Sequence, residues 1–248
     1  MTSTIKYCLF DLDGLLIDSE RMYTEVTNDI LSKYGKQFNW TLKANMMGKH
    51  ERVASEYLVS ELNLPITVDD YLLLRNQKQA EAWPRLILRP GALKLIKHLL
   101  KHNIPIAVAT GSRRTSLEQK MRAQPVKELM DLFGDNVVTA DDITPGRGKP
   151  SPDTFLLAAQ RLGATVGFNV DSNDAPTEEH LVTRKSCLVF EDAVPGAQAG
   201  LNANMEVIWI PEEPLLELYK DDPSIQGVKQ TLSSLEQLHL PSFGLPDY

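Results

Sequence analysis

Two aspartates, Asp11 and Asp13, follow the short apolar run from Ile5 to Phe10, and Gly14 comes directly after them. A short apolar run of this kind is typical of a strand buried on both faces of a parallel sheet. Because the chain must turn at Gly14, both carboxylates are expected to project into the crevice at the strand's end. Two close carboxylates repel each other, so the pKa of one rises unless a cation lies between them. The pattern favours a nucleophile and an acid–base group beside a cation; a solvated turn is the structural alternative.

Two later turns carry groups that suit a phosphate. Thr110, Gly111 and Ser112 follow a second apolar run, Ile104 to Ala109. Hydroxyls and free N–H groups at such a turn can bind phosphate oxygens. Lys149 stands at the start of an expected helix, where a fixed ammonium would offset charge on a phosphoryl group and on its nucleophile. Each feature alone is ordinary, because Thr-Gly-Ser is common in turns and most lysines are solvated.

A pair of acidic residues, Glu191 and Asp192, closes a third apolar run, Cys187 to Phe190. Carboxylates at the end of a buried strand are costly unless they are paired or bind a metal. Their hard oxygen atoms suit Mg²⁺. Four such motifs in this order, each at a strand end or in the loop that serves it, indicate one phosphoryl-transfer site.

The remaining patterns alternate between strands and helices. Weaker strand signals cover Val137 to Thr139 and Val207 to Ile210, and helical patterns cover Pro90 to His102, Ser151 to Leu162 and Pro195 to Ala203, with Pro90 at a first helical position. The alternation predicts an α/β fold with a doubly wound, mostly parallel, Rossmann-like sheet and right-handed crossovers. The polar segment Val166 to Ser186 is interpreted as an exposed loop.

One stretch, from Asp18 to about Leu86, has no convincing strand. Asp18 or Ser19 can cap a helix that stops at Gly35, and further helical patterns cover Trp40 to Met47, Arg52 to Leu62 and Asp69 to Trp83. We expect residues 18–86 to form a helical cap domain on an α/β core made of residues 1–17 and 87–248. Ligands of open α/β sheets bind at the carboxyl ends of the strands, so the insertion is placed to cover the site.

Composition narrows the classes of partner. The chain has 248 residues, with 26 Lys and Arg against 33 Asp and Glu, so its net charge of −7 argues against binding a nucleic acid polymer. No run of about 18 apolar residues indicates a membrane span. Cys8 and Cys187 lie in apolar runs and are interpreted as buried structural thiols. We expect a monomer in the cytoplasm, with nuclear entry left open.

The four motifs resemble those of the haloacid dehalogenase superfamily of phosphotransferases, and the resemblance spans nearly the whole chain. Asp18, Ser19 and Glu20, followed by the helical insertion, resemble the subgroup with a small helical cap. Within that subgroup the chain is most similar to the pseudouridine-5′-phosphatases, in the stretches Phe10 to Leu16, Met47 to Lys49, Leu99 to Pro105, Cys187 to Ala193 and Phe243 to Pro246.

The resemblance implies roles for the acidic residues. Asp11 would attack phosphorus and form an aspartyl-phosphate, and Asp13 would protonate the leaving alkoxide and then deprotonate the hydrolytic water. Mg²⁺ would be held by the Asp11 carboxylate, the main-chain carbonyl of Asp13 and Asp192, with Glu191 nearby or ligating through water.

The resemblance also implies roles for the binding residues. Thr110 would hold the phosphoryl oxygens together with the N–H groups of Gly111 and Ser112. Lys149 would neutralise the charge that spreads over those oxygens. The cap would close over the site, and Lys49 would reach the leaving group.

The resulting expectation is a Mg²⁺-dependent phosphatase for a small phosphorylated metabolite, a nucleotide or sugar phosphate such as pseudouridine 5′-phosphate. Several alternatives stay open at this stage. They are a phosphosugar mutase of the β-phosphoglucomutase type, a phosphatase for 2-deoxyglucose 6-phosphate or glycerol 3-phosphate, a dehalogenase, and a non-enzymatic binding protein on the same fold.

Overall fold

A six-stranded sheet forms the centre of the computed structural model, which describes residues 4–46, 51–169 and 175–248. The strand order is β3-β2-β1-β4-β5-β6, and all neighbouring strands run parallel. The strands are β1 (Tyr7–Phe10), β2 (Ile106–Ala109), β3 (Val137–Val138), β4 (Cys187–Glu191), β5 (Glu206–Trp209) and β6 (Gln230–Thr231). The predicted doubly wound α/β fold is confirmed, and β6 is an edge strand that the sequence patterns missed.

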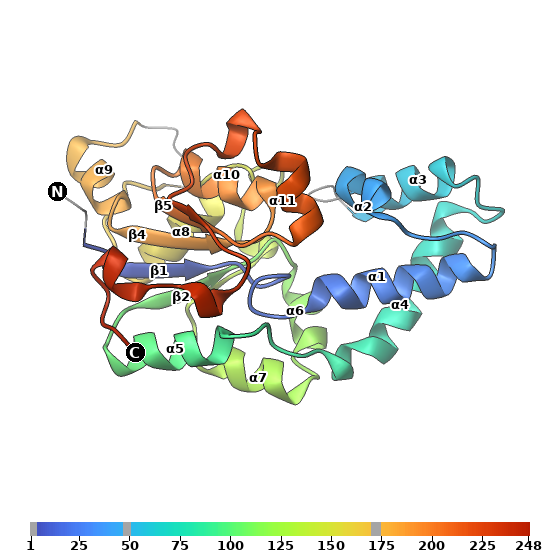
Figure 1. Cartoon of the computed structure of the whole chain (residues 1–248), viewed down its shortest axis with the longest axis horizontal. Helices are drawn as coiled ribbons and strands as arrows, with labels where there is room; N and C mark the ends of the chain where they lie inside the picture. The colour runs from blue at the N-terminus through green and yellow to red at the C-terminus, as the bar shows by residue number, and fades with distance from the viewer. Residues whose placement is uncertain (1–3, 47–50, 170–174) are drawn as a thin grey trace.

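Helices cover both faces of the sheet (Figure 1), and alternate strand residues are buried against them. Leu9 and Val189 share one buried core with helices α8 (Asp153–Arg161) and α10 (Val194–Asn202). Phe10 and Phe190 belong to the other core, with α5 (Ala92–Lys101) and α7 (Gln124–Asp131), and their rings stack with centroids 4.6 Å apart. This period-two burial on both faces explains why the strands read as uninterrupted apolar runs.

Two helix predictions need correction. The helix expected from Pro90 begins at Ala92, because Gly91 before it adopts φ 82°, a left-handed conformation that ends the preceding turn. The segment predicted as an exposed loop contains helix α9 (Glu178–Arg184), whose first turn is capped by the Thr177 hydroxyl. Arg184 in this helix is buried, and its Nε donates to the carbonyl oxygen of Val166 at 2.8 Å.

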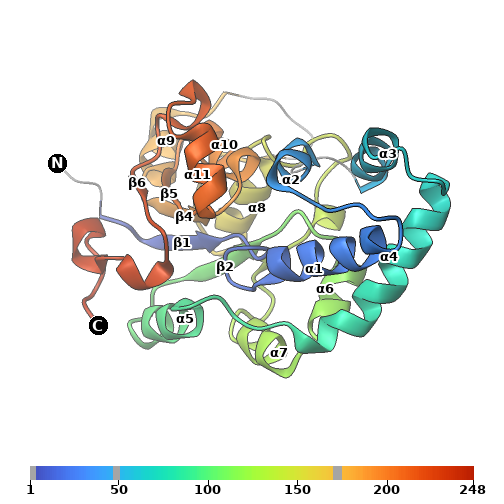
Figure 2. The ribbon, with the colours of Figure 1, turned by 45° about the vertical axis from the view of Figure 1, so that its right-hand side comes forward.

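The insertion after β1 extends to one side of the sheet (Figures 1 and 2), and its described residues contain α-helices. They are α1 (Ser19–Ser32), α2 (Trp40–Met46), α3 (Glu51–Glu61) and α4 (Val68–Ala82), close to the predicted spans. Helix α1 packs along α4, and α3 packs on both α2 and α4. Met22, Val26 and Ile30 are buried at the spacing of one helix face. The division into a core and a cap at residues 18 and 86 stays a prediction.

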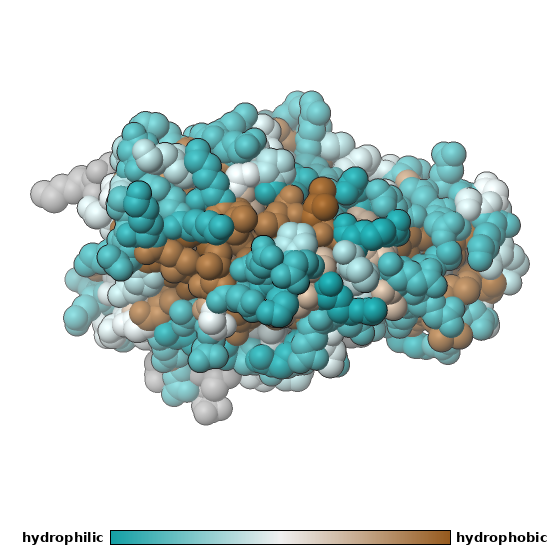
Figure 3. Space-filling model, turned by 90° about the horizontal axis from the view of Figure 1, so that it is seen from below, coloured by the Kyte–Doolittle hydropathy of each residue, from teal (hydrophilic) through white to brown (hydrophobic). Residues whose placement is uncertain are grey.

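The remaining helices are short. They comprise α6 (Arg114–Lys120) and α11 (Glu213–Tyr219), and the 3₁₀ helices η1 (Trp83–Arg85), η2 (Ala140–Asp142), η3 (Pro223–Ile225), η4 (Leu235–Gln237) and η5 (Leu240–Phe243). Seen from below, an apolar area on the left half of the molecule is surrounded by hydrophilic residues (Figure 3). Within the described ranges, no helix is both long and apolar enough to cross a membrane. Both cysteines are free and buried, as predicted.

The sheet order sets the position of the site. From β1 the chain moves outward through β2 and β3 on one side, and later through β4, β5 and β6 on the other. The order therefore reverses between β1 and β4. In open α/β sheets, this reversal opens a crevice at the carboxyl ends of the two strands. Asp11 follows β1, and Glu191 and Asp192 stand at the end of β4, so the predicted acidic residues meet at this point.

Candidate active site

The turn after β1 brings Asp11 and Asp192 together. The Asp11 amide continues the sheet by donating to the Phe190 carbonyl oxygen at 3.0 Å, and its side chain is buried. Gly14 then adopts φ 85°, and a Cβ at this position would collide with Oδ2 of Asp192. Glycine is therefore required here both by the left-handed backbone and by the close approach of the carboxylate.

Lys149 joins the two sides of the crevice. Its Nζ lies 2.5 Å from Oδ1 of Asp11, 2.6 Å from Oε1 of Glu191 and 2.8 Å from the carbonyl oxygen of Ala109. These three contacts use all three N–H donors of the ammonium. Burial alone would lower the pKa of Lys149, but the two carboxylates outweigh that effect and raise it, so Lys149 is a fixed cation.

Glu191 is held rigidly in the position that receives Lys149. Its Oε2 accepts the backbone N–H groups of Asp192 and Ala193, both at 3.0 Å, while Oε1 accepts Lys149. A Cβ on Gly196, in the first turn of α10, would collide with this carboxylate. Both oxygens of Glu191 therefore have hydrogen-bond partners within the protein, and Lys149 is one of them.

The acidic residues fit a divalent cation. Oxygen atoms of Asp11, Glu191 and Asp192 lie within 4.8 Å of one another, and Oδ1 of Asp192 is buried without a hydrogen-bond partner. Such an orphaned carboxylate oxygen is expected where a cation completes the site. The crevice holds four carboxyl groups and two ammonium groups, so its charge is −2 when every carboxyl group is ionised, the state that a bound cation favours. The six residues are Asp11, Asp13, Glu191, Asp192, Lys120 and Lys149. Hard oxygen ligands and this charge suit Mg²⁺.

The pKa shifts of the two aspartates have the same cause. Burial, with Lys149 opposing it and Glu191 adding to it, raises the pKa of Asp11 to about 7. Burial together with the charges of Glu191 and Asp11 raises the pKa of Asp192 well above its ordinary value. A cation between them would favour the ionised form of both groups.

Asp13 is paired with a different lysine from the one that contacts Asp11. Nζ of Lys120 lies 2.6 Å from each of its carboxylate oxygens, and the Ser112 hydroxyl donates to Oδ2 at 2.8 Å. Burial alone would raise the pKa of Asp13, but Lys120 outweighs it and the pKa is lowered. Asp13 is therefore a carboxylate in the substrate-free protein.

The predicted hydroxyl turn lies at the same edge of the sheet. Oγ1 of Thr110 is buried, accepts the N–H of Ser112 at 3.0 Å and lies 3.5 Å from Oδ2 of Asp13. Gly111 between them is exposed, and a Cβ there would meet no atom within 4 Å. The turn thus places two hydroxyls beside Asp13, while the Ser112 N–H is already bonded within the turn.

Two cations of the region escaped sequence analysis, Lys120 and Lys43. Lys120 lies on a polar helix and Lys43 on a helix that also carries apolar residues, and no local signal marks either lysine side chain as buried. Their partners lie on other elements of the fold, so only a fold-level pairing of elements could have found them. Lys49, predicted to reach the leaving group, lies outside the described residues.

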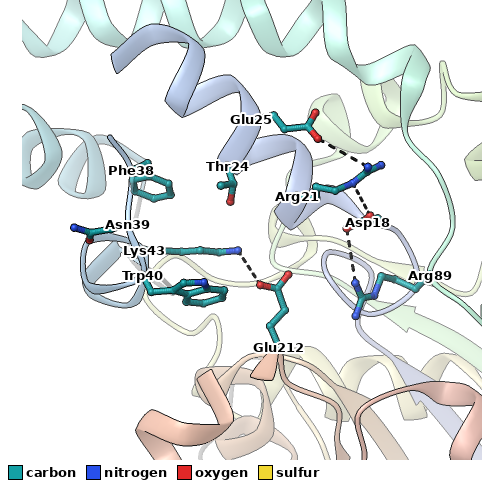
Figure 4. A pocket seen from close by; sticks show the side chains of 10 residues that line it. All are labelled: Asp18, Arg21, Thr24, Glu25, Phe38, Asn39, Trp40, Lys43, Arg89 and Glu212. Carbon is teal, nitrogen blue, oxygen red and sulfur yellow. Dashed lines mark hydrogen bonds and ion pairs between the residues drawn. The ribbon is translucent and has the colours of Figure 1, made fainter. Parts of the chain in front are cut away.

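A cleft of about 350 Å³ opens between the inserted helices and the sheet domain (Figure 4). Lys43 of α2 crosses it, with Nζ 3.0 Å from Oε2 of Glu20 and 3.3 Å from Oε2 of Glu212. The lining residues are Asp18, Arg21, Thr24, Glu25, Phe38, Asn39, Trp40, Lys43, Arg89 and Glu212. Glu20 also lies beside Gly14 and contributes to the raised pKa of Asp192, so the cleft adjoins the acidic site.

Comparison with known proteins gives matches along the whole chain. Residues 5–204 match the model of the haloacid dehalogenase-like hydrolases. The chain is 36% identical to (DL)-glycerol-3-phosphatase 2 of Arabidopsis thaliana, over 99% of this chain and 93% of that protein. It is also 36% identical to a probable pseudouridine-5′-phosphatase of Saccharomyces cerevisiae, over 97% of this chain and 98% of the other.

Solved structures agree with these matches. A HAD family hydrolase from Deinococcus radiodurans, crystallised with bound phosphate and sodium, superposes with a TM-score of 0.74 at 25% identity. The superposition covers 99% of this chain and 100% of that one. The similarity therefore includes the inserted helices as well as the sheet.

Proposed function

The chain belongs to the haloacid dehalogenase-like hydrolase family, as its motifs suggested, and is a phosphoric monoester hydrolase; from this premise we propose that it is a Mg²⁺-dependent phosphatase that works through an aspartyl-phosphate on Asp11. One observation carries the proposal. Lys149 is fixed between Asp11 and Glu191, beside the buried and unpartnered Oδ1 of Asp192. This arrangement supports the proposal because two carboxyl groups and a fixed positive charge lie together where β1 and β4 end.

In the first step, a carboxylate oxygen of Asp11 forms a bond to phosphorus as the bond from phosphorus to the leaving oxygen breaks. Asp13 takes up a proton when the substrate binds and gives it to the leaving oxygen. The fixed charge of Lys149 offsets the charge of the phosphoryl oxygens, and the hydroxyl of Thr110 and the N–H of Gly111 hold those oxygens.

In the second step, Asp13 removes a proton from water, whose oxygen attacks the phosphorus of the aspartyl-phosphate. Phosphate leaves, and the Asp11 carboxylate is restored. Mg²⁺ would be held by the Asp11 carboxylate, the main-chain carbonyl of Asp13 and Asp192, and when bound it neutralises charge on the phosphoryl oxygens.

The leaving group is proposed to lie in the cleft between the inserted helices and the sheet domain. A cleft of about 350 Å³ suits a nucleoside, a sugar or glycerol, and its aromatic and polar lining offers both stacking and hydrogen bonds. The two relatives at 36% identity point to glycerol 3-phosphate and to pseudouridine 5′-phosphate. We propose pseudouridine 5′-phosphate as the substrate, with glycerol 3-phosphate as the second candidate. A monomer in the cytoplasm also remains a proposal.

A substrate panel tests this function. Purified protein with Mg²⁺ is incubated with pseudouridine 5′-phosphate, glycerol 3-phosphate, 2-deoxyglucose 6-phosphate and p-nitrophenyl phosphate, and released phosphate is measured. We expect phosphate release that EDTA abolishes and that Asp11→Asn lacks. No release from any substrate would reject the phosphatase.

A second incubation tests the mutase alternative. Wild-type protein receives β-glucose 1-phosphate with a bisphosphate primer, and both the sugar phosphates and free phosphate are followed. Formation of the isomer without free phosphate would replace the phosphatase by a phosphosugar mutase.

A further inference from the structure

Lys120 is a fully buried lysine that the proposed mechanism does not use. It is the last residue of α6, and its side chain has no exposed surface. Its Nζ contacts both oxygens of Asp13 at 2.6 Å and Oγ of Ser112 at 2.7 Å. A buried ammonium is costly unless it is paired and hydrogen-bonded, so Asp13 accounts for the burial of Lys120.

The contacts hold Asp13 in one orientation. Lys120 binds both oxygens of the carboxylate, and the Ser112 hydroxyl binds Oδ2 from a third direction. The Asp13 side chain is 19% exposed, more than that of Asp11 or Asp192, so packing restrains it less than theirs. An acid–base group must lie within hydrogen-bonding reach of the proton that it transfers, which makes its orientation part of its efficiency.

Residues of the inserted helices complete the surroundings of Lys120. Tyr23 of α1 accepts a hydrogen bond from it, and Nζ lies 5.8 Å from the centre of the Trp83 ring. The rings of Tyr23 and Trp83 pack edge to face, and the Trp83 indole donates to the side chain of Gln119 at 3.0 Å. The position of Lys120 is therefore set from both the sheet domain and the inserted helices.

We propose that Lys120 is a positioning residue for Asp13, which holds the acid–base carboxylate in the orientation required for both proton transfers. This inference rests on the proposed function, because it takes from there the role of Asp13. It adds a second lysine to the site, with a task different from that of Lys149. Lys149 contacts the nucleophile, whereas Lys120 donates hydrogen bonds to the acid–base group, Ser112 and Tyr23.

A double-mutant cycle between Lys120 and Asp13 tests the inference. The kcat and KM of p-nitrophenyl phosphate and of the best natural substrate are measured with Mg²⁺ for the wild type, Lys120→Met, Asp13→Asn and the double variant. Lys127→Met is the matched control, because it removes a lysine whose partner, Asp131, lies on the exposed surface of α7. Circular dichroism and thermal unfolding establish that each variant is folded.

We expect Lys120→Met to lower kcat by about 10- to 100-fold, within the range of general acid–base catalysis, with KM changed by less than about threefold. In the Asp13→Asn background the same substitution should lower kcat by less than about threefold, because its effect passes through the missing carboxylate. Lys120→Arg should restore part of the loss. Lys127→Met should match the wild type.

Two results would overturn the inference. One is a kcat for Lys120→Met equal to that of the wild type. The other is a double variant whose loss of kcat equals the product of the two single losses, which would mean that Lys120 acts on the phosphoryl group directly. If Lys120→Met does not fold, Lys120→Gln takes its place in the cycle, since its neutral amide cannot repeat the charged contacts to both oxygens of Asp13. Failure of the proposed function would appear separately, as a wild-type protein without activity or an Asp13→Asn variant with full activity.

Discussion

Replacing Gly14 by alanine tests whether the close approach of Asp192 to the turn after β1 matters for activity. Gly14 has φ 85°, and an alanine Cβ would collide with Oδ2 of Asp192 and lie 3.1 Å from Cγ of Glu20. Gly163 provides a matched control, with φ 84° and no atom within 4 Å of its added Cβ. A left-handed alanine costs about 1–2 kcal/mol at either position, so both variants should lose that amount of the free energy of unfolding. Gly14→Ala should lose about 1–3 kcal/mol more, because its methyl group collides with Asp192.

Only Gly14→Ala should also lose activity. Asp192 is buried, and its Oδ1 has no hydrogen-bond partner, so the added methyl group must displace the carboxylate from the proposed metal site. A shift of about 1 Å at a reacting site can lower the rate about 100-fold. We therefore expect kcat of Gly14→Ala to fall about 100-fold relative to Gly163→Ala, with a higher Mg²⁺ concentration needed for half-maximal rate.

The assay combines urea unfolding with steady-state kinetics across a Mg²⁺ titration. Both substitutions should lower the free energy of unfolding in EDTA, Gly14→Ala by the larger amount. Only the Gly163 variant should reach wild-type kcat at saturating Mg²⁺. If kcat of Gly14→Ala stays within about twofold of Gly163→Ala, the reasoning that Asp192 must occupy its present position is refuted.

Three further predictions follow from the charges of the site. Lys149→Met should lower kcat by about 100- to 1000-fold, because it removes the fixed cation beside Asp11, while the surface control Lys127→Met should not. Steady-state kinetics on folded variants check this, and equal kcat values for the two variants would contradict it. In EDTA, the free energy of unfolding should fall as pH rises from about 4 to 7. The pKa of Asp11 is about 7 in the folded state against 3.8 ordinarily, so the folded state binds more protons across that range. Urea unfolding at several pH values checks this, and an equally steep fall with saturating Mg²⁺ would contradict it. Lys43→Met should raise KM more than it lowers kcat. Without Lys43, Glu20 and Glu212 would face the cleft as unpaired carboxylates that repel an anionic substrate. Steady-state kinetics check this, and an unchanged KM would argue against the cleft as the substrate site.

Much of the site could be predicted because its residues lie directly after predicted strands. Asp11, Glu191 and Asp192 each stand directly at the end of an apolar run that becomes a buried parallel strand. Parallel strands place their carboxyl ends at one edge of the sheet, so such residues meet wherever the strands are neighbours. Lys149 was predicted to lie near a phosphoryl group, and the structure brings it to the expected aspartate.

Residues whose burial depends on helix packing could not be predicted in this way. Lys120 meets Asp13 across more than a hundred residues of chain, and the helix that carries it reads as polar, with no pattern that indicates which face is buried. Helix α9 was missed for a different reason. It is one of the shortest helices, and a polar stretch with a capping threonine resembles an exposed loop unless the cap itself is recognised. The edge strand β6 has two residues and no apolar run.

The central claim is that Asp11 becomes phosphorylated during turnover. Its most direct test is rapid acid quenching of the protein during turnover of p-nitrophenyl phosphate with Mg²⁺, followed by borohydride reduction and peptide mass analysis. Reduction converts an aspartyl-phosphate to homoserine, so the account predicts homoserine at position 11 in the wild type and none in Asp11→Asn. Turnover without any modification at position 11, or homoserine at another aspartate, would contradict it.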